Sequence, residues 1–387
     1  MNCPNKKEDD TTKIMMKAAV YQEFGGPILV QDVPFPETPP DGVVVQVMAT
    51  GVCRSDWHGW KGHDDDIRNH GLPFVPGHEL SGIVIDVGPS CSNHNVGDRV
   101  AVPFILSCGS CEYCVPGGRH RPTVCLHQEQ PGFTRHGSFA EYVALPRADR
   151  NLKTLPPSVS FVQAAALGCR FTTAYRAVLQ QGKLLVYKND NKNKGPTVAI
   201  FGAGGLGLSC VMLAVAAGTA SQIIAIDVSP LALKKAQELG ATHVVLASRD
   251  NSNNEQVRQK VNGITKGGAD ISIDAGGFAA TCENAIYCTR RGGRMVQVGL
   301  PIGEVLPKVP MGLVAGRELE LVGSHGFDAQ DLPALLQMIV DGKLDPARLV
   351  EKEVTLEEGA QAIQDMDHGS PLGITVVTKF RTNASRL

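Results

Sequence analysis

Four cysteines in the first third of the sequence have the spacing of a metal site. Cys108, Cys111, Cys114 and Cys125 follow the pattern C-x2-C-x2-C-x10-C in the stretch CGSCEYCVPGGRHRPTVC. In a reducing compartment such a cluster binds metal more often than it forms disulfides, and four thiolates complete a tetrahedral zinc shell without an open position. We therefore expect a structural zinc ion. An iron–sulfur cluster, disulfides and idle thiols are the alternatives, although the ferredoxin run closes with C-x3-C-P and this one does not.

A glycine-rich stretch in the second half, FGAGGLG, has the form G-x-G-x-x-G. It follows an apolar run and opens a helical pattern, which is the context that distinguishes a dinucleotide-binding fingerprint from chance. Glycine permits the tight turn, the approach of backbone to a pyrophosphate and close helix–strand packing, and the helix N-terminus receives the phosphate charge. The residues of this predicted cofactor-binding turn are Gly202, Gly204, Gly205, Leu206 and Gly207.

An acidic residue at the end of the next predicted strand supports this interpretation. Asp227 lies 20 residues after Gly207, where a carboxylate can accept hydrogen bonds from the adenosine ribose. The same charge would repel a 2′-phosphate, so the sequence favours NAD over NADP. An aspartate that caps a helix or forms a turn is the alternative.

Further potential metal ligands lie in three separated stretches. GVCRSDWHGW and PGHELSG lie in the first quarter of the chain, and ALGCRFTTAYRAV lies near its middle. Taken singly, each residue has a structural explanation as a buried thiol, a turn histidine or a surface acid. The residues in question are Cys53, Asp56, His58, His78, Glu79 and Cys169.

The composition is that of an ordinary soluble globular protein of two or three domains. With 387 residues, 43% of them hydrophobic and 20% charged, and a formal charge of -2, the chain has no basic excess to hold nucleic acid. We expect residues 1–16, which lack an apolar signal-peptide core, to form a disordered leader, and we expect a cytoplasmic protein. The uncharged stretch 195–226 is long enough for a membrane span, but its six glycines fit a strand, turn and helix better.

The type of secondary structure changes near residue 195. Before it, short segments such as GVVVQVMATGVC and ELSGIVIDVGPS predict strands in an irregular β-rich domain. After it, apolar strands such as QIIAIDVS and ADISIDAGG alternate with helical patterns such as PLALKKAQELGA, which predicts a parallel sheet covered on both faces. The tail returns to a helix, LEEGAQAIQDM, and a final strand, GITVVTKF.

Taken together and in this order, these stretches resemble the zinc-containing medium-chain alcohol dehydrogenases from about Lys17 to Lys379. The most specific element is GHELSGIVIDVGPSC, which follows that family's zinc signature from Gly77 to Cys91. The resemblance implies an α/β protein with a GroES-like, β-rich catalytic domain and a doubly wound Rossmann domain for NAD. The expected boundaries are 17–172 for the catalytic domain, 173–326 for the Rossmann domain and 327–387 for a return to the catalytic domain.

The resemblance also implies an enzyme that transfers a hydride between an alcohol and NAD, interconverting the alcohol with an aldehyde or ketone. It implies two zinc ions per chain, one catalytic and one structural, and a homo-dimer or homo-tetramer. Small-molecule substrates are the expected partners, without nucleic acid or membrane. A catalytically silent zinc-bearing dinucleotide sensor and a cysteine-rich interaction module fused to a Rossmann domain are the alternatives.

The implied catalytic zinc is held by Cys53, His78 and Cys169 with a fourth position open. Ser55 and His58 are implied as a proton relay, with Glu79 behind the zinc as an alternative or supporting carboxylate. The remaining implied roles are Arg54 near the pyrophosphate, Thr173 near the nicotinamide, Phe104 in the substrate pocket and Asp56 as the partner that fixes the tautomer of His78.

Three features depart from the family pattern. The family's structural lobe usually has a shorter final spacing, whereas VPGGRHRPTV supplies ten residues here. Arg170 follows Cys169, where the family often has a small residue. Many members also have a basic residue in the last strand near the cofactor, and the nearest position here is Ile374. We therefore expect pyrophosphate contacts to depend more on Arg54 and the glycine turn.

Overall fold

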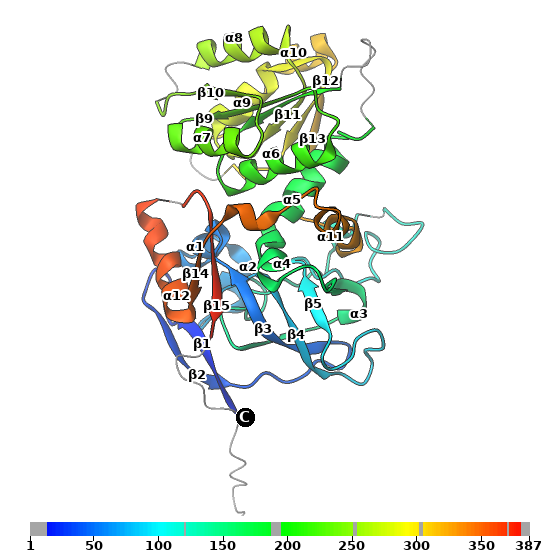
Figure 1. Cartoon of the computed structure of the whole chain (residues 1–387), viewed down its shortest axis with the longest axis vertical. Helices are drawn as coiled ribbons and strands as arrows, with labels where there is room; N and C mark the ends of the chain where they lie inside the picture. The colour runs from blue at the N-terminus through cyan, green and yellow to red at the C-terminus, as the bar shows by residue number, and fades with distance from the viewer. Residues whose placement is uncertain are drawn as a thin grey trace, which may run out of the picture.

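The computed structural model describes residues 14–119, 121–186, 195–250, 254–301, 305–369 and 371–380. Two regions follow one another along the long axis of the molecule, a layered α/β region and a β-rich region (Figure 1). Segments from the middle and the end of the chain lie between them, among them α5 (Thr172–Tyr175) and α11 (Leu332–Val340).

The α/β region is built on a six-stranded parallel sheet in the order β10-β9-β8-β11-β12-β13. Chain order reverses direction between β8 and β11, and ligands of such sheets bind in the crevice outside the carboxyl ends of the strands at this reversal. The strands are β8 (Thr197–Phe201), β9 (Gln222–Asp227), β10 (His243–Leu246), β11 (Ala269–Asp274), β12 (Thr289–Gln297) and β13 (Glu320–Gly323).

Side chains of the central strand β8 alternate between two hydrophobic cores. Val198 and Ile200 join the core that contains α6, whereas Ala199 and Phe201 join the core formed with α8 and α9. Since successive strand residues point to opposite faces, an all-apolar strand requires helices on both sides. The covering helices are α6 (Gly205–Ala217), α7 (Pro230–Glu238), α8 (Asn254–Thr265), α9 (Ala279–Tyr287) and α10 (Met311–Arg317).

The β-rich region contains a seven-stranded mixed sheet and a separate antiparallel pair, β1-β2. The sheet runs β14-β15-β3-β4-β5-β7, with β6 paired to β3. Its strands are β3 (Val43–Gly51), β4 (Glu79–Val87), β5 (Arg99–Val102), β6 (Tyr142–Leu145), β7 (Lys153–Thr154), β14 (Val350–Thr355) and β15 (Ile374–Lys379), and the pair is β1 (Met15–Tyr21) and β2 (Ile28–Pro34).

Helical segments connect these strands and cover the sheet. The α-helices are α1 (Arg54–Trp60), α2 (Asp65–His70), α3 (Ala148–Asn151), α4 (Phe161–Ala166), α5, α11 and α12 (Leu356–Asp365). Short 3-10 segments are η1 (Pro122–Val124), η4 (Ala329–Asp331), η5 (Pro346–Leu349) and η6 (Met366–His368). Two wider π-helical segments, η2 (Leu167–Phe171) and η3 (Arg176–Gln181), flank α5.

The strands β14 and β15 complete the seven-stranded sheet that begins with β3. Residues of β15 pair with the last residues of β3, Val376 with Gly51 and Val377 with Thr50, and β14 pairs with β15 (Figure 1). The backbone N–H of Val52 also donates to the Thr375 carbonyl at 2.9 Å. The last strand therefore completes the sheet at the point where β3 leads into α1.

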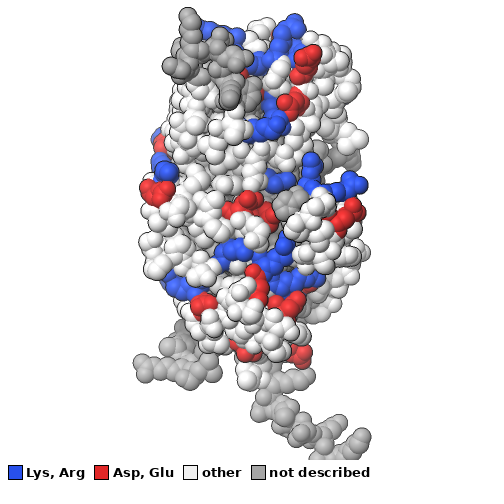
Figure 2. All heavy atoms as spheres, turned by 90° about the vertical axis from the view of Figure 1, so that its right-hand side faces the viewer, with Lys and Arg blue, Asp and Glu red and all other residues white. Residues whose placement is uncertain are grey.

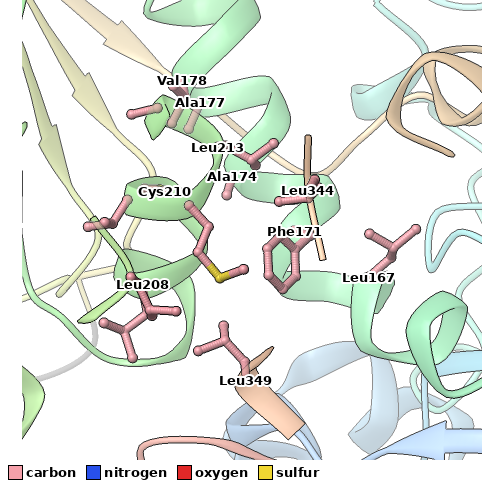
Figure 3. Packing of buried hydrophobic residues seen from close by; sticks show 14 of the residues in the cluster. Leu167, Phe171, Ala174, Ala177, Val178, Leu208, Cys210, Leu213, Leu344 and Leu349 are labelled. Atoms are coloured by element: carbon pink, nitrogen blue, oxygen red, sulfur yellow. The ribbon is translucent and has the colours of Figure 1, made fainter. Parts of the chain in front are cut away.

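One hydrophobic core joins the two regions. Phe171, which is fully buried, lies between Leu208 and Cys210 of α6 on one side and Leu167 on the other, with Leu349 of η5 nearby (Figure 3). This packing fixes the helical stretch from α4 to η3 against the α/β region.

One boundary predicted from the sequence needs correction. The leader expected over residues 1–16 ends earlier, because β1 begins at Met15, where it pairs with Pro34, and Met16 is buried in the core. Residues 1–13 of that leader lie outside the described residues. The other domain boundaries stay predictions. Among the described residues, no helix is long and apolar enough to span a membrane.

Candidate active site and structural metal centre

The four clustered cysteines have the geometry of a single tetrahedral metal ion. Cys111 Sγ lies 3.5 Å from Cys114 Sγ and 3.8 Å from Cys125 Sγ, and Cys108 Sγ lies 3.9 Å from Cys114 Sγ. A tetrahedron with Zn–S bonds of about 2.3 Å has S···S edges of about 3.8 Å, whereas a disulfide needs about 2.05 Å. In an iron–sulfur cluster the thiolates would be farther apart, because each iron has its own ligands. The arrangement fits structural zinc.

Backbone donors stabilise the thiolate form of this cluster. Ser110 N–H and Cys111 N–H donate to Cys108 Sγ, and His127 N–H donates to Cys125 Sγ. Burial favours the neutral thiol of Cys108, but the bonds from Ser110 N–H, Cys111 N–H and the Ser110 hydroxyl lower its pKa to about 5. Burial raises the pKa of Cys114 and Cys125, so these two thiols need a metal ion to lose their protons. A thiolate is the form that binds metal.

Arg119 and Arg121, which lie between the third and fourth cysteines, fold back against Glu112 and Tyr113. Arg119 N–H donates to the Glu112 carbonyl at 2.9 Å and Arg121 N–H to the Tyr113 carbonyl at 2.8 Å. The Arg119 side chain pairs with the Glu112 carboxylate at 3.0 Å. Cys125 therefore still reaches the other three cysteines after ten intervening residues.

A second group of buried ligand atoms comes from separated parts of the chain. One ligand atom from each of Cys53, His78, Glu79 and Cys169 lies within 4.8 Å of the others. Antiparallel pairing of Gly51 with Glu79 brings the end of β3 beside the start of β4, which places Cys53 near His78. Cys169 arrives from η2. The structure thus brings together the three expected zinc ligands and the expected neighbouring carboxylate.

Asp56 organises two of these ligands through three hydrogen bonds. Its Oδ2 accepts from Cys53 N–H at 2.9 Å, and its Oδ1 accepts from Gly77 N–H at 3.1 Å and from His78 Nδ1–H at 2.9 Å. His78 Nε2 is buried and makes no hydrogen bond within the described structure. Because a buried polar atom without a partner is unfavourable, this free nitrogen fits a metal ligand whose other nitrogen is held by a carboxylate.

The carboxylate of Glu79 contacts the backbone of Cys169. Its Oε1 accepts from Cys169 N–H at 3.0 Å, and its buried Oε2 has no hydrogen-bond partner within the described structure. Gly168 permits this approach, because a Cβ at that position would lie 2.4 Å from Glu79 Cβ and Cγ. Burial raises the pKa of Glu79 to about 7, although Arg170 opposes the rise.

The two thiols of this group are coupled through a hydrogen bond. That bond lowers the pKa of Cys53 and raises the pKa of Cys169, with burial opposing the charged form of both. The imidazole of His78 also lowers the pKa of Cys53. The hydrogen bond from Cys169 thus favours the thiolate of Cys53, and a bound metal ion would favour both thiolates.

Two phenylalanines line one side of the histidine ligand. The ring centroid of Phe133 is 5.0 Å from that of His78, and the centroid of Phe104 is 6.2 Å away. Both phenylalanines are buried. Phe104 was expected from the resemblance, whereas Phe133 was missed because it lies in an irregular loop without a distinguishing pattern.

The predicted relay residues lie on α1. Ser55 and His58 are three positions apart, which places them on the same side of the helix. His58 Nδ1 lies 3.2 Å from Nδ1 of His63, a residue that the sequence interpretation missed. Burial, Arg54 and His63 lower the pKa of His58 to about 4, so its imidazole is neutral at physiological pH.

The side chain of Arg54 contacts η6 and Trp57. Its Nη1 donates to the Met366 carbonyl of η6 at 2.7 Å, and its guanidinium lies 3.5 Å from the centroid of the Trp57 ring. Trp57 Nε1–H and Lys61 Nζ both donate to the Asp367 carboxylate, at 2.7 Å each. The predicted role of Arg54 at a pyrophosphate stays a prediction.

The glycine turn lies at the crevice of the parallel sheet. Gly202 has a φ of +92°, and a Cβ on Gly207 would lie 1.8 Å from the Gly202 carbonyl oxygen, so the turn requires both glycines. A Cβ on Gly204 would meet nothing within 4 Å, so this side of the turn is open. Asp227 Oδ2 accepts from Ala203 N–H at 2.6 Å, which holds the carboxylate beside the turn.

Two further observations concern Thr173 and the distribution of charge on one face of the molecule. Thr173, expected near the nicotinamide, is buried on α5, and its role there stays a prediction. On the molecular face drawn in Figure 2, Lys and Arg side chains are interspersed with Asp and Glu, so this face has no large surface of one charge.

Comparison with known proteins agrees with this geometry. Residues 39–156 match the alcohol dehydrogenase GroES-like domain, and residues 205–341 match the zinc-binding dehydrogenase domain. An alcohol dehydrogenase of Geobacillus stearothermophilus is 34% identical over 330 residues, covering 85% of this chain and 90% of the relative. An NAD-dependent alcohol dehydrogenase of Sulfurisphaera tokodaii is 31% identical over 369 residues, covering 94% and 99%.

A solved structure extends the comparison to the whole fold. A zinc-binding dehydrogenase of Sinorhizobium meliloti 1021, solved with bound NADP, superimposes with a TM-score of 0.79 at 25% identity, covering 95% of this chain and 100% of that one. The chain therefore belongs to the zinc-containing medium-chain alcohol dehydrogenase family, and it is an oxidoreductase. The expected fold class, a GroES-like domain with a Rossmann domain, is confirmed.

The bonds of Asp56 generate a prediction about metal affinity. Asp56→Asn removes the negative charge behind His78 and an acceptor for Cys53 N–H, so we expect zinc affinity at this site to fall roughly 10- to 100-fold. Competition with a chromophoric chelator measures this affinity. Asp270→Asn is the control, since Asp270 is equally buried but bonds Thr197 in the parallel sheet. Unchanged zinc affinity in Asp56→Asn would contradict the assignment.

Proposed function

We propose that this chain is an NAD-linked zinc alcohol dehydrogenase that holds one catalytic and one structural zinc ion. The observation that carries the proposal is the buried set of Cys53, His78 and Cys169, in which the free Nε2 of His78 is held in place by Asp56. Two thiolates and one neutral imidazole are a known catalytic zinc shell with an open fourth position. Cys108, Cys111, Cys114 and Cys125 would hold the structural ion.

The chemistry divides between the bound groups and the side chains. Zinc would supply a Lewis acid for the oxygen of an alcohol or carbonyl, and NAD would supply the hydride acceptor. Phe104 and Phe133 exclude water beside His78 and offer an apolar surface to the carbon skeleton of the substrate. The family relationship supports alcohols, aldehydes and ketones as the substrate class.

The proton released by alcohol oxidation requires a route to solvent. Ser55 is partly exposed on the first turn of α1, next to Cys53, and its hydroxyl can both accept and donate a proton. We propose that His58, neutral because of its lowered pKa, then takes this proton on its imidazole. The adjacent His63 extends the line of imidazoles.

We propose NAD rather than NADP because of the position of Asp227. Its carboxylate is held at the carboxyl end of β9 by Ala203 N–H and Ser229 N–H, at 2.6 and 2.8 Å. A negative charge there favours ribose hydroxyls and repels a 2′-phosphate. Since the similar dehydrogenase of S. meliloti was solved with NADP, the fold alone does not determine cofactor choice.

Cellular setting and assembly form part of the same proposal. Thiolate metal sites persist in a reducing compartment, which supports the cytoplasm. A homo-dimer or homo-tetramer is supported by the family resemblance alone. Neither the sensor nor the interaction-module alternative has a supporting observation in the described structure.

The two metal sites should be separable by substitution. Cys111→Ser should lower zinc from about two to about one ion per chain and lower Tm, because the structural shell loses a ligand. Cys53→Ser should abolish turnover while fold and NAD binding persist. Elemental analysis of chelator-free protein, thermal unfolding and a turnover assay give the three readouts. Cys91→Ser, outside both clusters, is the control. One zinc per wild-type chain, unaffected by Cys111→Ser, would refute the structural site.

Cofactor choice gives a second test. Wild-type protein should use NAD with a much higher kcat/KM than NADP, and Asp227→Ser should narrow the gap by removing charge repulsion with the 2′-phosphate. Steady-state kinetics with both cofactors measure the ratio. Wild-type protein with equal or better kcat/KM for NADP would disprove the proposed preference.

The proton route predicts a change in pH dependence. His58→Gln should slow alcohol oxidation mainly at low and neutral pH, where solvent base is scarce, and the difference should shrink as pH rises. Zinc content should not change, since His58 is not a ligand. The pH profile of kcat, compared with that of the control His243→Gln on β10, tests this route. A profile in His58→Gln identical to wild type would exclude the relay.

A further inference from the structure

Arg170 is a buried cation beside the proposed catalytic zinc site. Its side chain is 9% exposed, and its Nε lies 3.7 Å from Oε1 of the fully buried Glu79. Its Nη2 donates to the carbonyl of Val52, directly before Cys53. A buried guanidinium is costly unless several of its five N–H donors are paired, and the Cys53 thiol is a third partner of Arg170 beside Glu79 and the Val52 carbonyl.

The same side chain lies against the predicted pyrophosphate-binding turn. A Cβ on Gly205 would be 3.0 Å from Cδ, 3.2 Å from Nε and 3.5 Å from Cζ of Arg170. Gly205 is the first residue of α6, whose first N–H groups have no partner within the helix and attract an anion. The guanidinium therefore adds a full positive charge next to this helix N-terminus.

Arg54 and Ile374, the other two positions expected near the pyrophosphate, are placed differently. Arg54 bonds the Met366 carbonyl and stacks on Trp57. Ile374, in the last strand, is fully buried in the apolar core and offers no charge. Arg170 is thus a cation already fixed at the turn, held by Glu79 and the Val52 carbonyl before any ligand arrives.

We propose that Arg170 binds the pyrophosphate of the dinucleotide, from the side of the metal site, and supplies a phosphate contact that the last strand does not provide. The inference rests on the proposed NAD-linked function. The ion pair between Arg170 and Glu79 keeps the guanidinium in place, so its positive charge is preorganised at the glycine turn. An Arg fork suits this task because it presents parallel donors to phosphate oxygens.

The test compares a ligand that contains a pyrophosphate with one that lacks it. Calorimetry with ADP-ribose, and competition with adenosine, would be carried out on zinc-loaded wild type, Arg170→Lys and Arg170→Gln. Arg170→Gln should raise the Kd of ADP-ribose roughly 10- to 100-fold, as expected for loss of a charge-assisted hydrogen bond, and leave the Kd of adenosine unchanged. Arg170→Lys, which keeps the charge without the fork, should lie between them.

Two further variants separate binding from stability. Arg294→Gln removes another buried arginine that pairs with a glutamate, Glu320, and a carbonyl, that of Gln181, but lies on β12. It should lower Tm without changing the Kd of ADP-ribose. If Arg170→Gln does not fold, the double variant Arg170→Gln/Glu79→Gln removes both charges of the pair and should still bind ADP-ribose weakly.

The possible outcomes distinguish this inference from the proposed function. Wild-type affinity for ADP-ribose in Arg170→Gln or the double variant would overturn the role of Arg170 alone. Equal weakening of ADP-ribose and adenosine would also overturn it, since a purely structural role has that effect. Wild-type protein that binds neither NAD nor ADP-ribose would refute the proposed function and this inference together.

Discussion

The carboxylate of Asp56 is the interaction on which the site depends. It is almost fully buried, and it is satisfied by Cys53 N–H, Gly77 N–H and His78 Nδ1–H. These bonds connect the helix start after β3 with the segment that enters β4, and they aim the other imidazole nitrogen at the two thiols. Asp56 also occupies the third position of α1, where a carboxylate commonly caps the helix. One acidic side chain thus begins a helix and orients a metal ligand.

Local sequence patterns predicted those parts of the structure that are formed by neighbouring residues. The cysteine lobe, the glycine turn and the β-branched strands each depend on spacing within a short stretch. The convergence of Cys169 with His78, 91 positions apart, followed only from the family resemblance, because packing of η2 against β4 leaves no signal in either stretch alone. Phe133, His63 and the contact of Arg170 with Gly205 could not be predicted, since they depend on how loops and helices pack. The leader predicted over residues 1–16 reaches into β1, because Met15 and Met16 carry no strand pattern of their own.

The irregular helical stretch formed by η2 and α5 lies between the proposed metal site and the proposed cofactor site. From η2 to α5 it carries Cys169, Arg170 and Thr173, while Phe171 faces the core shared with α6 (Figure 3). Consecutive side chains therefore point to a metal site, a nucleotide turn and the hydrophobic core. The wider π-helical turn and the kink at Gly168 allow this spread of directions, as π-bulges often do at functional sites. Any shift of this stretch would move Cys169 and Arg170 together.

The pairing of β15 with β3 has a consequence for biosynthesis. The ribosome makes Cys53 and His78 long before β15, the strand that pairs with the end of β3. Domains normally fold as units during synthesis, but here the seven-stranded sheet stays two strands short until β14 and β15 have been made. The cysteine lobe, contained within 108–125, needs no such wait. The proposed structural metal ion could therefore bind before the sheet that carries Cys53 and His78 is complete, and a product truncated before β14 would keep the cysteine cluster but lack two strands of that sheet.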